Sequence, residues 1–158
     1  MLLLMLYYRR PDEKVYFLIL FCALSCSKTE HSYFPSYPVY LELDLTFEDK
    51  DLNGVMAYKE YILGKTPGLG KTERTGFGGV LVYHDMFGYS AYDLACPYET
   101  QMNVRVKMDE DGIHVVCPKC GSKYNVYEAS GNRVEGPATR GLKQYQTALS
   151  GTKLYVTN

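Results

Sequence analysis

Two short cysteine-containing segments constrain this chain more than any other feature of its sequence. The first is Cys96-Pro97-Tyr98-Glu99, and the second is Cys117-Pro118-Lys119-Cys120-Gly121-Ser122. Residues 100–116 separate them, a spacing that is typical of one metal or cluster site built from two adjacent loops. The sequence therefore predicts that the cysteines of the two segments meet in the folded protein.

The composition favours a single β-rich domain and gives no sign of a nucleic-acid partner. The 158-residue chain has a formal net charge of −1 and no basic block, so we expect no nucleic acid to bind. Sixteen tyrosines, no tryptophan and fourteen glycines suit short strands and turns better than a helical bundle. The length fits one domain and is short for two.

The N-terminal residues 1–25 are expected to form a signal peptide of the lipoprotein type. Residues 15–24 are apolar, and three basic residues precede them: Arg9, Arg10 and Lys14. The Ala23-Leu24-Ser25-Cys26 sequence resembles a bacterial lipobox, in which the cysteine carries the lipid and becomes the mature N-terminus. An uncleaved anchor and a buried apolar segment are the alternatives. We therefore expect lipid on Cys26.

A lipid on Cys26 places the protein at the bacterial cell envelope, anchored to the membrane with its domain outside the cytoplasm. An envelope protein is a further expected partner. Residues 26–37 are largely polar and contain proline, and they are predicted to form a linker. Residues 38–158 are then the β domain, with a cysteine-loop subdomain at about 94–138.

Alternating apolar and polar residues predict a half-buried strand at the start of this domain. Five apolar side chains share one face: Val39, Leu41, Leu43, Leu45 and Phe47. Further along the chain, strands at 80–83 and 89–94 form a predicted hairpin that leads to Cys96. A second hairpin, with strands at 104–108 and 113–116 and an Asp-Gly turn, leads to Cys117.

Short strands continue to the end of the chain. They are predicted at 124–127, 133–135, 142–145 and 154–156. No long amphipathic helix is apparent in the sequence. Short strands at regular spacing predict an all-β fold, an antiparallel sandwich or barrel.

From about Gly79 to Val156, the order of features resembles that of Rieske iron–sulfur domains. The matching residues are Tyr89 and Tyr92, Cys96-Pro97, Cys117-Pro118, Gly121-Ser122, Tyr124, Gly136-Pro137-Ala138 and Leu142. The resemblance covers about half of the chain. It implies an all-β base that carries a small two-loop subdomain, similar to rubredoxin or a zinc ribbon, in which a cluster is held.

In that family each loop supplies one cysteine and one histidine to a [2Fe–2S] cluster. Cys96 and Cys117 stand at the cysteine positions here, whereas Tyr98 and Cys120 stand at the two histidine positions. The resemblance therefore implies a degenerate member of the family in which both ligand histidines are replaced. It also implies supporting roles around the cluster for Ser122, Tyr124 and Pro137. Surface or packing roles are expected for the chain's three histidines, His31, His84 and His114.

The residues that are present also suit zinc. Cys117-Pro-Lys-Cys120 is the turn found in zinc ribbons, and Cys96-x-x-Glu99 can oppose it with a carboxylate in place of a thiolate. A non-standard [2Fe–2S] cluster would use the three cysteines and a fourth ligand such as Tyr98. A disulfide between Cys96 and one of the second pair is the metal-free alternative in an exported protein. Thiol–disulfide exchange at Cys117 and Cys120 is another alternative.

The sequence favours a structural or interaction module over an enzyme. It contains no supported Ser-His-Asp order and no nucleotide-binding fingerprint. The expected cofactor is zinc or none, with the loops held together by the metal or by a disulfide. The alternative hypothesis is an electron-transfer protein that carries a non-standard [2Fe–2S] cluster.

Overall fold

A computed structural model describes residue 35 and residues 37–158, and it confirms the all-β, antiparallel class predicted from the sequence. The predicted signal peptide, Cys26 and most of the predicted linker lie outside these described residues. The described helices are two short 3₁₀ turns, η1 (Lys50–Asn53) and η2 (Tyr127–Ala129). No helix among the described residues is both long enough and apolar enough to cross a membrane.

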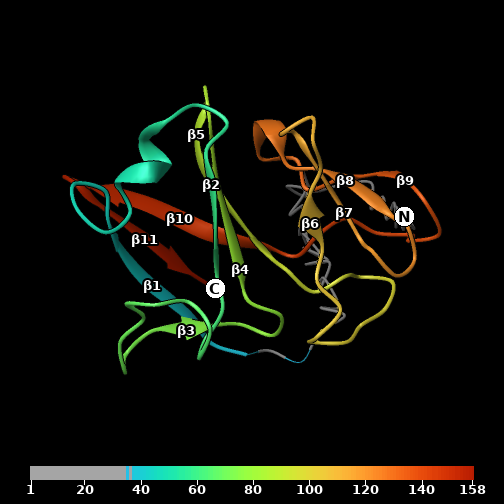
Figure 1. Cartoon of the computed structure of the whole chain (residues 1–158), viewed down its shortest axis with the longest axis horizontal. Coiled ribbons are helices and arrows are strands. Elements are labelled where there is room, and N and C mark those ends of the chain that lie inside the picture. The colour runs from blue at the N-terminus through green and yellow to red at the C-terminus, as the bar shows by residue number, and fades with distance from the viewer. Residues whose placement is uncertain (1–34, 36) are drawn as a thin grey trace, which may run out of the picture. The chain divides into compact units, whose positions relative to one another are not determined.

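The larger of two antiparallel sheets has seven strands in the order β2-β4-β5-β10-β11-β1-β3 (Figure 1). Their bounds are β1 Val39–Asp44, β2 Tyr58–Tyr61, β3 Arg74–Thr75, β4 Val80–Asp85, β5 Gly88–Asp93, β10 Gln144–Ser150 and β11 Lys153–Thr157. The predicted first hairpin is β4–β5, and its strands run on until only Met86 and Phe87 separate them. This hairpin delivers the chain to Cys96.

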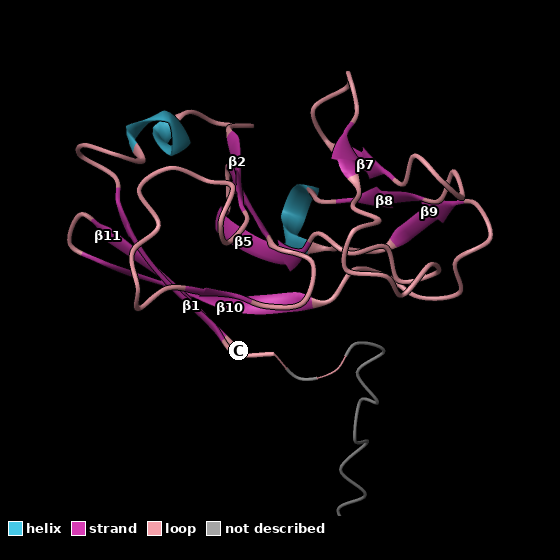
Figure 2. Cartoon of the chain, turned by 60° about the horizontal axis from the view of Figure 1, so that its bottom comes forward, coloured by secondary structure: helices cyan, strands magenta, loops and turns pink. Residues whose placement is uncertain are grey.

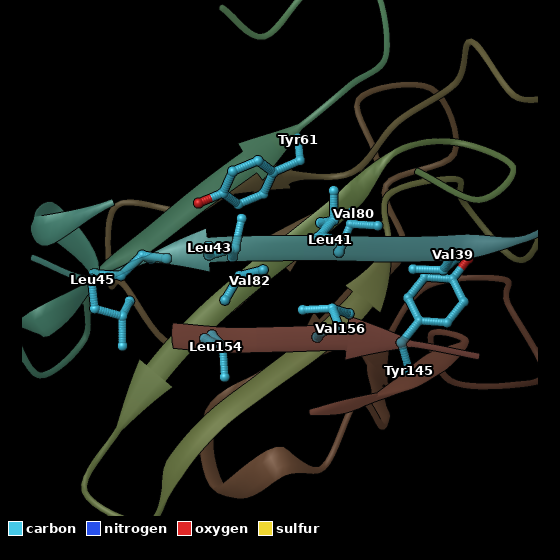
Figure 3. Close-up of a cluster of buried hydrophobic side chains, with 12 residues drawn as sticks. Val39, Leu41, Leu43, Leu45, Tyr61, Val80, Val82, Tyr145, Leu154 and Val156 are labelled. Carbon is cyan, nitrogen blue, oxygen red and sulfur yellow. The ribbon is translucent and has the colours of Figure 1, made fainter. Parts of the chain in front are cut away.

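The core of the larger sheet explains the alternation in the sequence. Leu41 and Leu43 of β1 meet Val80 and Val82 of β4 in one cluster, and each side chain is at most 2% exposed (Figure 3). Strands β1 and β4 are not neighbours in the sheet, so the sheet curves to bring their apolar faces together. Burial of each such side chain stabilises the fold by about 1.5–3 kcal/mol.

The first strand is shorter than its alternation predicts. β1 ends at Asp44, and Phe47, which the pattern assigns to the buried face, is 77% exposed. The Asp44 carboxylate accepts a hydrogen bond from the Thr46 amide at 2.9 Å, and the Asp44 carbonyl accepts one from the Asp49 amide at 2.9 Å. These bonds turn the chain away from the sheet, so the apolar face ends at Leu45, which is 6% exposed.

The smaller sheet has four strands in the order β6-β7-β8-β9, and Figure 2 shows β7, β8 and β9 grouped apart from β1, β10 and β11. Its strands are β6 Lys107–Met108, β7 His114–Val116, β8 Lys123–Asn125 and β9 Arg133–Glu135. Its side chains Val115 and Tyr124 share a second core with Leu81 and Tyr92 of the larger sheet. This core fixes the two sheets to each other around the cysteines.

The second predicted hairpin is β6–β7, and it delivers the chain to Cys117. Its turn closes with a hydrogen bond from the Gly112 amide to the Asp109 carbonyl at 3.1 Å, and Gly112 has a φ of 70°. Only glycine adopts this conformation readily, which is why the Asp-Gly pair marks the turn. An isolated β-bridge between Ala95 and Arg105 joins the ends of the two hairpins.

Candidate metal centre

The two cysteine loops close in the same way. The carbonyl of Cys96 accepts a hydrogen bond from the amide of Thr100, four residues later, at 3.0 Å. The carbonyl of Cys117 accepts one from the amide of Gly121, also four residues later, at 3.0 Å. The fifth residue has a positive φ in both loops, 51° for Thr100 and 72° for Gly121. Two copies of one tight turn therefore face each other.

The turns bring three sulfur atoms together. The Sγ atoms of Cys96, Cys117 and Cys120 all lie within 4.8 Å of one another, as expected from the sequence spacing. Cys96 and Cys117 are fully buried, whereas Cys120 is partly exposed. All three are free thiols, and the 3.6 Å between the Sγ atoms of Cys96 and Cys120 far exceeds a disulfide bond of about 2.05 Å.

Two polar side chains from β8 and the residue before it contact the sulfurs. The Tyr124 hydroxyl lies 3.5 Å from Cys96 Sγ, and Ser122 Oγ lies 3.2 Å from Cys120 Sγ. Ser122 Oγ also accepts a hydrogen bond from the Ala138 amide at 3.1 Å, which ties the Gly-Pro-Ala segment to the second loop. Pro137 itself is exposed on that segment. Ser122 and Tyr124 therefore contact the sulfurs, and their supporting roles around a bound metal or cluster stay a prediction.

The close approach of the Gly-Pro-Ala segment requires a glycine. Gly136 has a φ of 91°, and a Cβ at this position would overlap the backbone of Ser122. Any other residue would push the segment away from the second loop and break the bond between Ser122 and Ala138.

The protein environment gives the two cysteines of the second loop different pKa values. Burial raises the pKa of the Cys117 thiol to about 12. Burial also opposes ionisation of Cys120, but hydrogen bonds with the hydroxyl and amide of Ser122 and with the neighbouring thiols hold the pKa of Cys120 below its ordinary value. Burial raises the pKa of Tyr124, so its phenol stays protonated and can donate a hydrogen bond to Cys96. Cys120 is therefore the readier of these two thiols to ionise.

The Glu99 carboxylate of the first loop is not part of the group of three sulfurs. The Glu99 carboxylate forms an ion pair with Lys119 of the second loop, with Nζ and Oε2 2.5 Å apart. Tyr98 is 54% exposed. The three sulfurs form a group of potential ligands without any carboxylate or imidazole from the described part of the chain. A ligand role for Glu99 stays a prediction, and it requires the ion pair with Lys119 to open.

Two of the three histidines can be placed, and both have other partners. His114 Nδ1 lies 2.7 Å from Asp111 Oδ2, and the His84 ring stacks on Tyr89 with centroids 4.1 Å apart. His31 lies outside the described residues. The placed histidines therefore have the surface and packing roles expected from the sequence.

Two residues of the centre were not identified from the sequence. Nothing in the sequence distinguishes Lys119 from an ordinary residue inside the cysteine turn, yet it forms the ion pair that links the two loops. Thr100 carries no signal at all, because a threonine gives no hint that its position needs a positive φ. Gly121 at the equivalent position of the second loop does carry that signal.

No family model matches the chain, and no curated protein sequence matches it. Solved structures do match. One is the plasma membrane Rieske protein PetC3 of the cyanobacterium Synechocystis PCC 6803, to which the chain is 29% identical. The match covers 51% of this chain and 78% of that chain, with a TM-score of 0.42. This chain is thus similar in part to a Rieske protein.

Proposed function

We propose that Cys96, Cys117 and Cys120 bind one Zn²⁺ ion that fastens the two loops, and that the protein is a structural and interaction module. The convergence of three sulfur atoms within 4.8 Å carries this proposal. Tetrahedral zinc with Zn–S bonds of about 2.3 Å holds its sulfurs about 3.8 Å apart. The 3.6 Å between the sulfurs of Cys96 and Cys120 is close to that separation.

One ion fits these residues better than two irons do. A [2Fe–2S] cluster needs two ligands on each iron, four in all, and the ligands of different irons are separated by the width of the cluster. The three sulfurs instead lie around a single point, and the described part of the chain places no imidazole beside them. Thiolate ligands of this kind suit zinc.

Bound zinc would supply stability rather than a reaction. Metal binding draws its ligands into the thiolate form, so it replaces the thiol protons and depends on pH. The Ser122 hydroxyl and the Tyr124 phenol can donate hydrogen bonds to the thiolates of Cys120 and Cys96, which orients them for the metal. Either water or Glu99, once released from Lys119, completes the four ligands.

Metal analysis and thiol mapping of the purified full chain test the zinc proposal. We expect about one zinc per chain, and alkylation of the three cysteines only after a chelator removes the metal. His84→Ala is the matched control and should leave the zinc content unchanged, because His84 stacks on Tyr89. Metal-free protein with three reactive thiols, or with a disulfide to Cys96, would contradict the proposal.

We further propose that the module is held at the cell envelope by lipid on Cys26. The basic residues, the apolar stretch and the lipobox-like sequence of residues 9–26 support this anchor. Replacement of Cys26 by Ser should move the protein from the membrane fraction to the soluble fraction, whereas Cys22→Ser should not. Equal membrane association of both variants would exclude the lipid anchor.

Electron transfer is the second candidate, and one observation favours it. Tyr124 and Ser122 contact cysteine sulfurs, and the resemblance assigns the matching residues of Rieske domains to hydrogen bonds at cluster and cysteine sulfur. An iron–sulfur chromophore with stoichiometric iron and sulfide in freshly purified protein would replace the zinc proposal. A colourless protein that contains zinc would exclude electron transfer at this site.

A further inference from the structure

A groove of about 780 Å³ runs beside the second cysteine loop. One wall is formed by β2 and the turn after it, and the other by residues 103–108 with the tip of the cysteine loop. β2 is the terminal strand of the larger sheet and β6 is the terminal strand of the smaller sheet (Figure 1). Residues of both strands line the groove, so it lies between two terminal strands. Terminal strands are common docking sites for extended peptides.

The lining of the groove is strongly positive. Its cations are Lys65, Arg105, Lys107 and Lys119, and its one acidic residue is Glu60. The chain as a whole has a net charge of −1, so positive charge is concentrated in this groove.

Two of these cations are available to an incoming anion. Lys65 and Lys107 are exposed, and neither forms an ion pair with any residue in the described part of the chain. Lys119, in contrast, is paired with Glu99. Lys107 also interacts electrostatically with the half-buried Glu60 of the lining, but the cations outnumber this one carboxylate, so the groove keeps a net positive charge for a partner.

The backbone fixes where the cations on the second wall point. Arg105 and Lys107 are two residues apart and lie on the same side of the strand, because side chains alternate along an extended chain. Val106 between them points the opposite way into the second core and is 1% exposed. The Nε atom of Arg105 donates a hydrogen bond to the Gly78 carbonyl, so the guanidinium is held in place.

Apolar side chains line the groove between the cations. Tyr58 is 47% exposed, and Ile62, Met108 and Pro118 also line it. The cations come from both walls of the groove, Lys65 from one and Arg105, Lys107 and Lys119 from the other. Spread charge with intervening apolar contacts suits an extended chain that alternates acidic and apolar residues.

We infer that this groove docks an extended acidic segment of a partner protein, with Lys65 and Lys107 as its main charge contacts. The inference goes beyond the proposed function and does not depend on which metal the cysteines hold. The interaction surface of the module is then the groove between β2 and β6. The partner's acidic side chains meet the lysines, and its apolar side chains cover Tyr58 and Ile62.

Fluorescence anisotropy with the purified full chain tests the inference. The probe is a short labelled peptide of alternating Glu and Val, and the same peptide with Gln in place of Glu is its neutral counterpart. We expect the acidic peptide to bind and the neutral peptide to bind much more weakly, with affinity falling as salt rises. The Lys65→Glu/Lys107→Glu double variant should bind the acidic peptide at least about tenfold more weakly.

The matched control is Lys50→Glu/Lys71→Glu, which makes the same charge change at two exposed lysines outside the groove lining. It should bind the acidic peptide as the unaltered chain does. Equal weakening by both double variants would overturn the inference, because net charge alone would then explain binding. Single-stranded DNA of matched charge, or tripolyphosphate, binding as tightly as the peptide would overturn it too, and absence of acidic-peptide binding would do the same.

Discussion

The two cysteine loops share a backbone and differ in their side chains. Each begins with Cys-Pro and closes with a hydrogen bond between residues four apart, and each places a positive φ at its fifth residue. At the fourth position the first loop has Glu99 and the second has Cys120. The first loop therefore contributes one sulfur to the centre and the second contributes two.

This difference shows how a shared turn can serve two tasks. In the second loop the fourth residue points its sulfur at Cys96, 3.6 Å away. In the first loop the fourth residue reaches across to Lys119 and pairs the loops by charge. The fourth residue of the second loop thus adds a sulfur to the centre, whereas that of the first loop pairs the two loops by charge, and the following predictions separate these roles.

Loss of a sulfur should have the largest effect. Cys117→Ala removes a fully buried sulfur, so under the zinc proposal we expect the chain to bind no zinc and to lose several kcal/mol of its free energy of unfolding, because structural zinc supplies folding energy directly. Glu99→Gln should keep its zinc and lose much less stability. Zinc content and chemical denaturation measure both variants. Equal zinc loss in the two variants would mean that Glu99 is a ligand as well.

The hydroxyl of Ser122 should have the next largest effect. Ser122→Ala leaves the buried Ala138 amide without its acceptor and removes the contact with Cys120 Sγ, so we expect a loss of about 1–3 kcal/mol. Thr139→Ala, at an exposed position on the same segment, is the control and should change stability little. A Ser122→Ala variant as stable as the control would mean that the Gly-Pro-Ala segment is held by other contacts.

A fourth thiolate should make the two loops equivalent. Glu99→Cys gives the first loop the Cys-x-x-Cys pattern of the second, and we expect its zinc affinity to rise at least about tenfold, or about 1.4 kcal/mol, in competition with a chelator. Glu99→Ser also breaks the ion pair with Lys119 but adds no thiolate, and it should not raise the affinity. The same rise in both variants would show that the gain comes from releasing Lys119.

Substitutions at the fifth residue of each loop should show the energetic cost of a positive φ alone. A Cβ at Gly121 meets nothing within 4 Å, so Gly121→Ala should lose about 1–2 kcal/mol through its positive φ. Thr100→Gly relieves the same conformation in the first loop and should gain up to about 1 kcal/mol. Thermal unfolding measures both. Opposite signs are expected, and a destabilised Thr100→Gly variant would show that the threonine side chain stabilises its loop.

Sequence reasoning succeeded where a pattern maps directly onto the backbone. Alternation at Val39, Leu41 and Leu43 identified β1, and the Asp-Gly turn identified the hairpin before Cys117. The spacing of the cysteines predicted that they meet, and their sulfurs do. Each of these features depends on residues close together in the sequence, or on a residue type that has few other uses.

Contacts that depend on competition between partners could not be predicted from the sequence. Glu99 has the spacing of a metal ligand, and that role stays a prediction, but the spacing does not reveal that Lys119 of the other loop is within 2.5 Å of its carboxylate. The groove likewise is lined by both Lys65 and Lys107, which are far apart in the sequence. Such contacts arise only when the two sheets pack on a common core.

The smallest effect we predict lies at the base of the second loop. Asp111 stabilises the hairpin that leads to Cys117. Its Oδ2 atom lies 2.7 Å from His114 Nδ1 and 3.2 Å from Lys123 Nζ. The hydrogen bond from His114, followed by those from the backbone amides of Ile113 and His114 and by Lys123, holds the pKa of Asp111 below its usual value. A carboxylate with a lowered pKa stabilises the folded state above its unfolded pKa, about 3.9, and loses that stabilisation as pH falls through its folded pKa.

Asp111→Asn should therefore lower the unfolding temperature slightly at pH 7, and this deficit should shrink as the pH falls below about 4. The effect is small because the pair is solvated and screened by salt. Glu110→Gln, at the exposed neighbouring position, is the control and should have the smaller deficit. Zinc content should stay unchanged in both variants, since Asp111 and its partners stabilise the hairpin and do not contact the sulfurs. If the deficit of Asp111→Asn is the same at pH 7 and pH 3, the charge of the carboxylate is not its cause, and Asp111 acts through the turn that its side chain holds. The two loops would then differ only in the side chains at the sulfur centre.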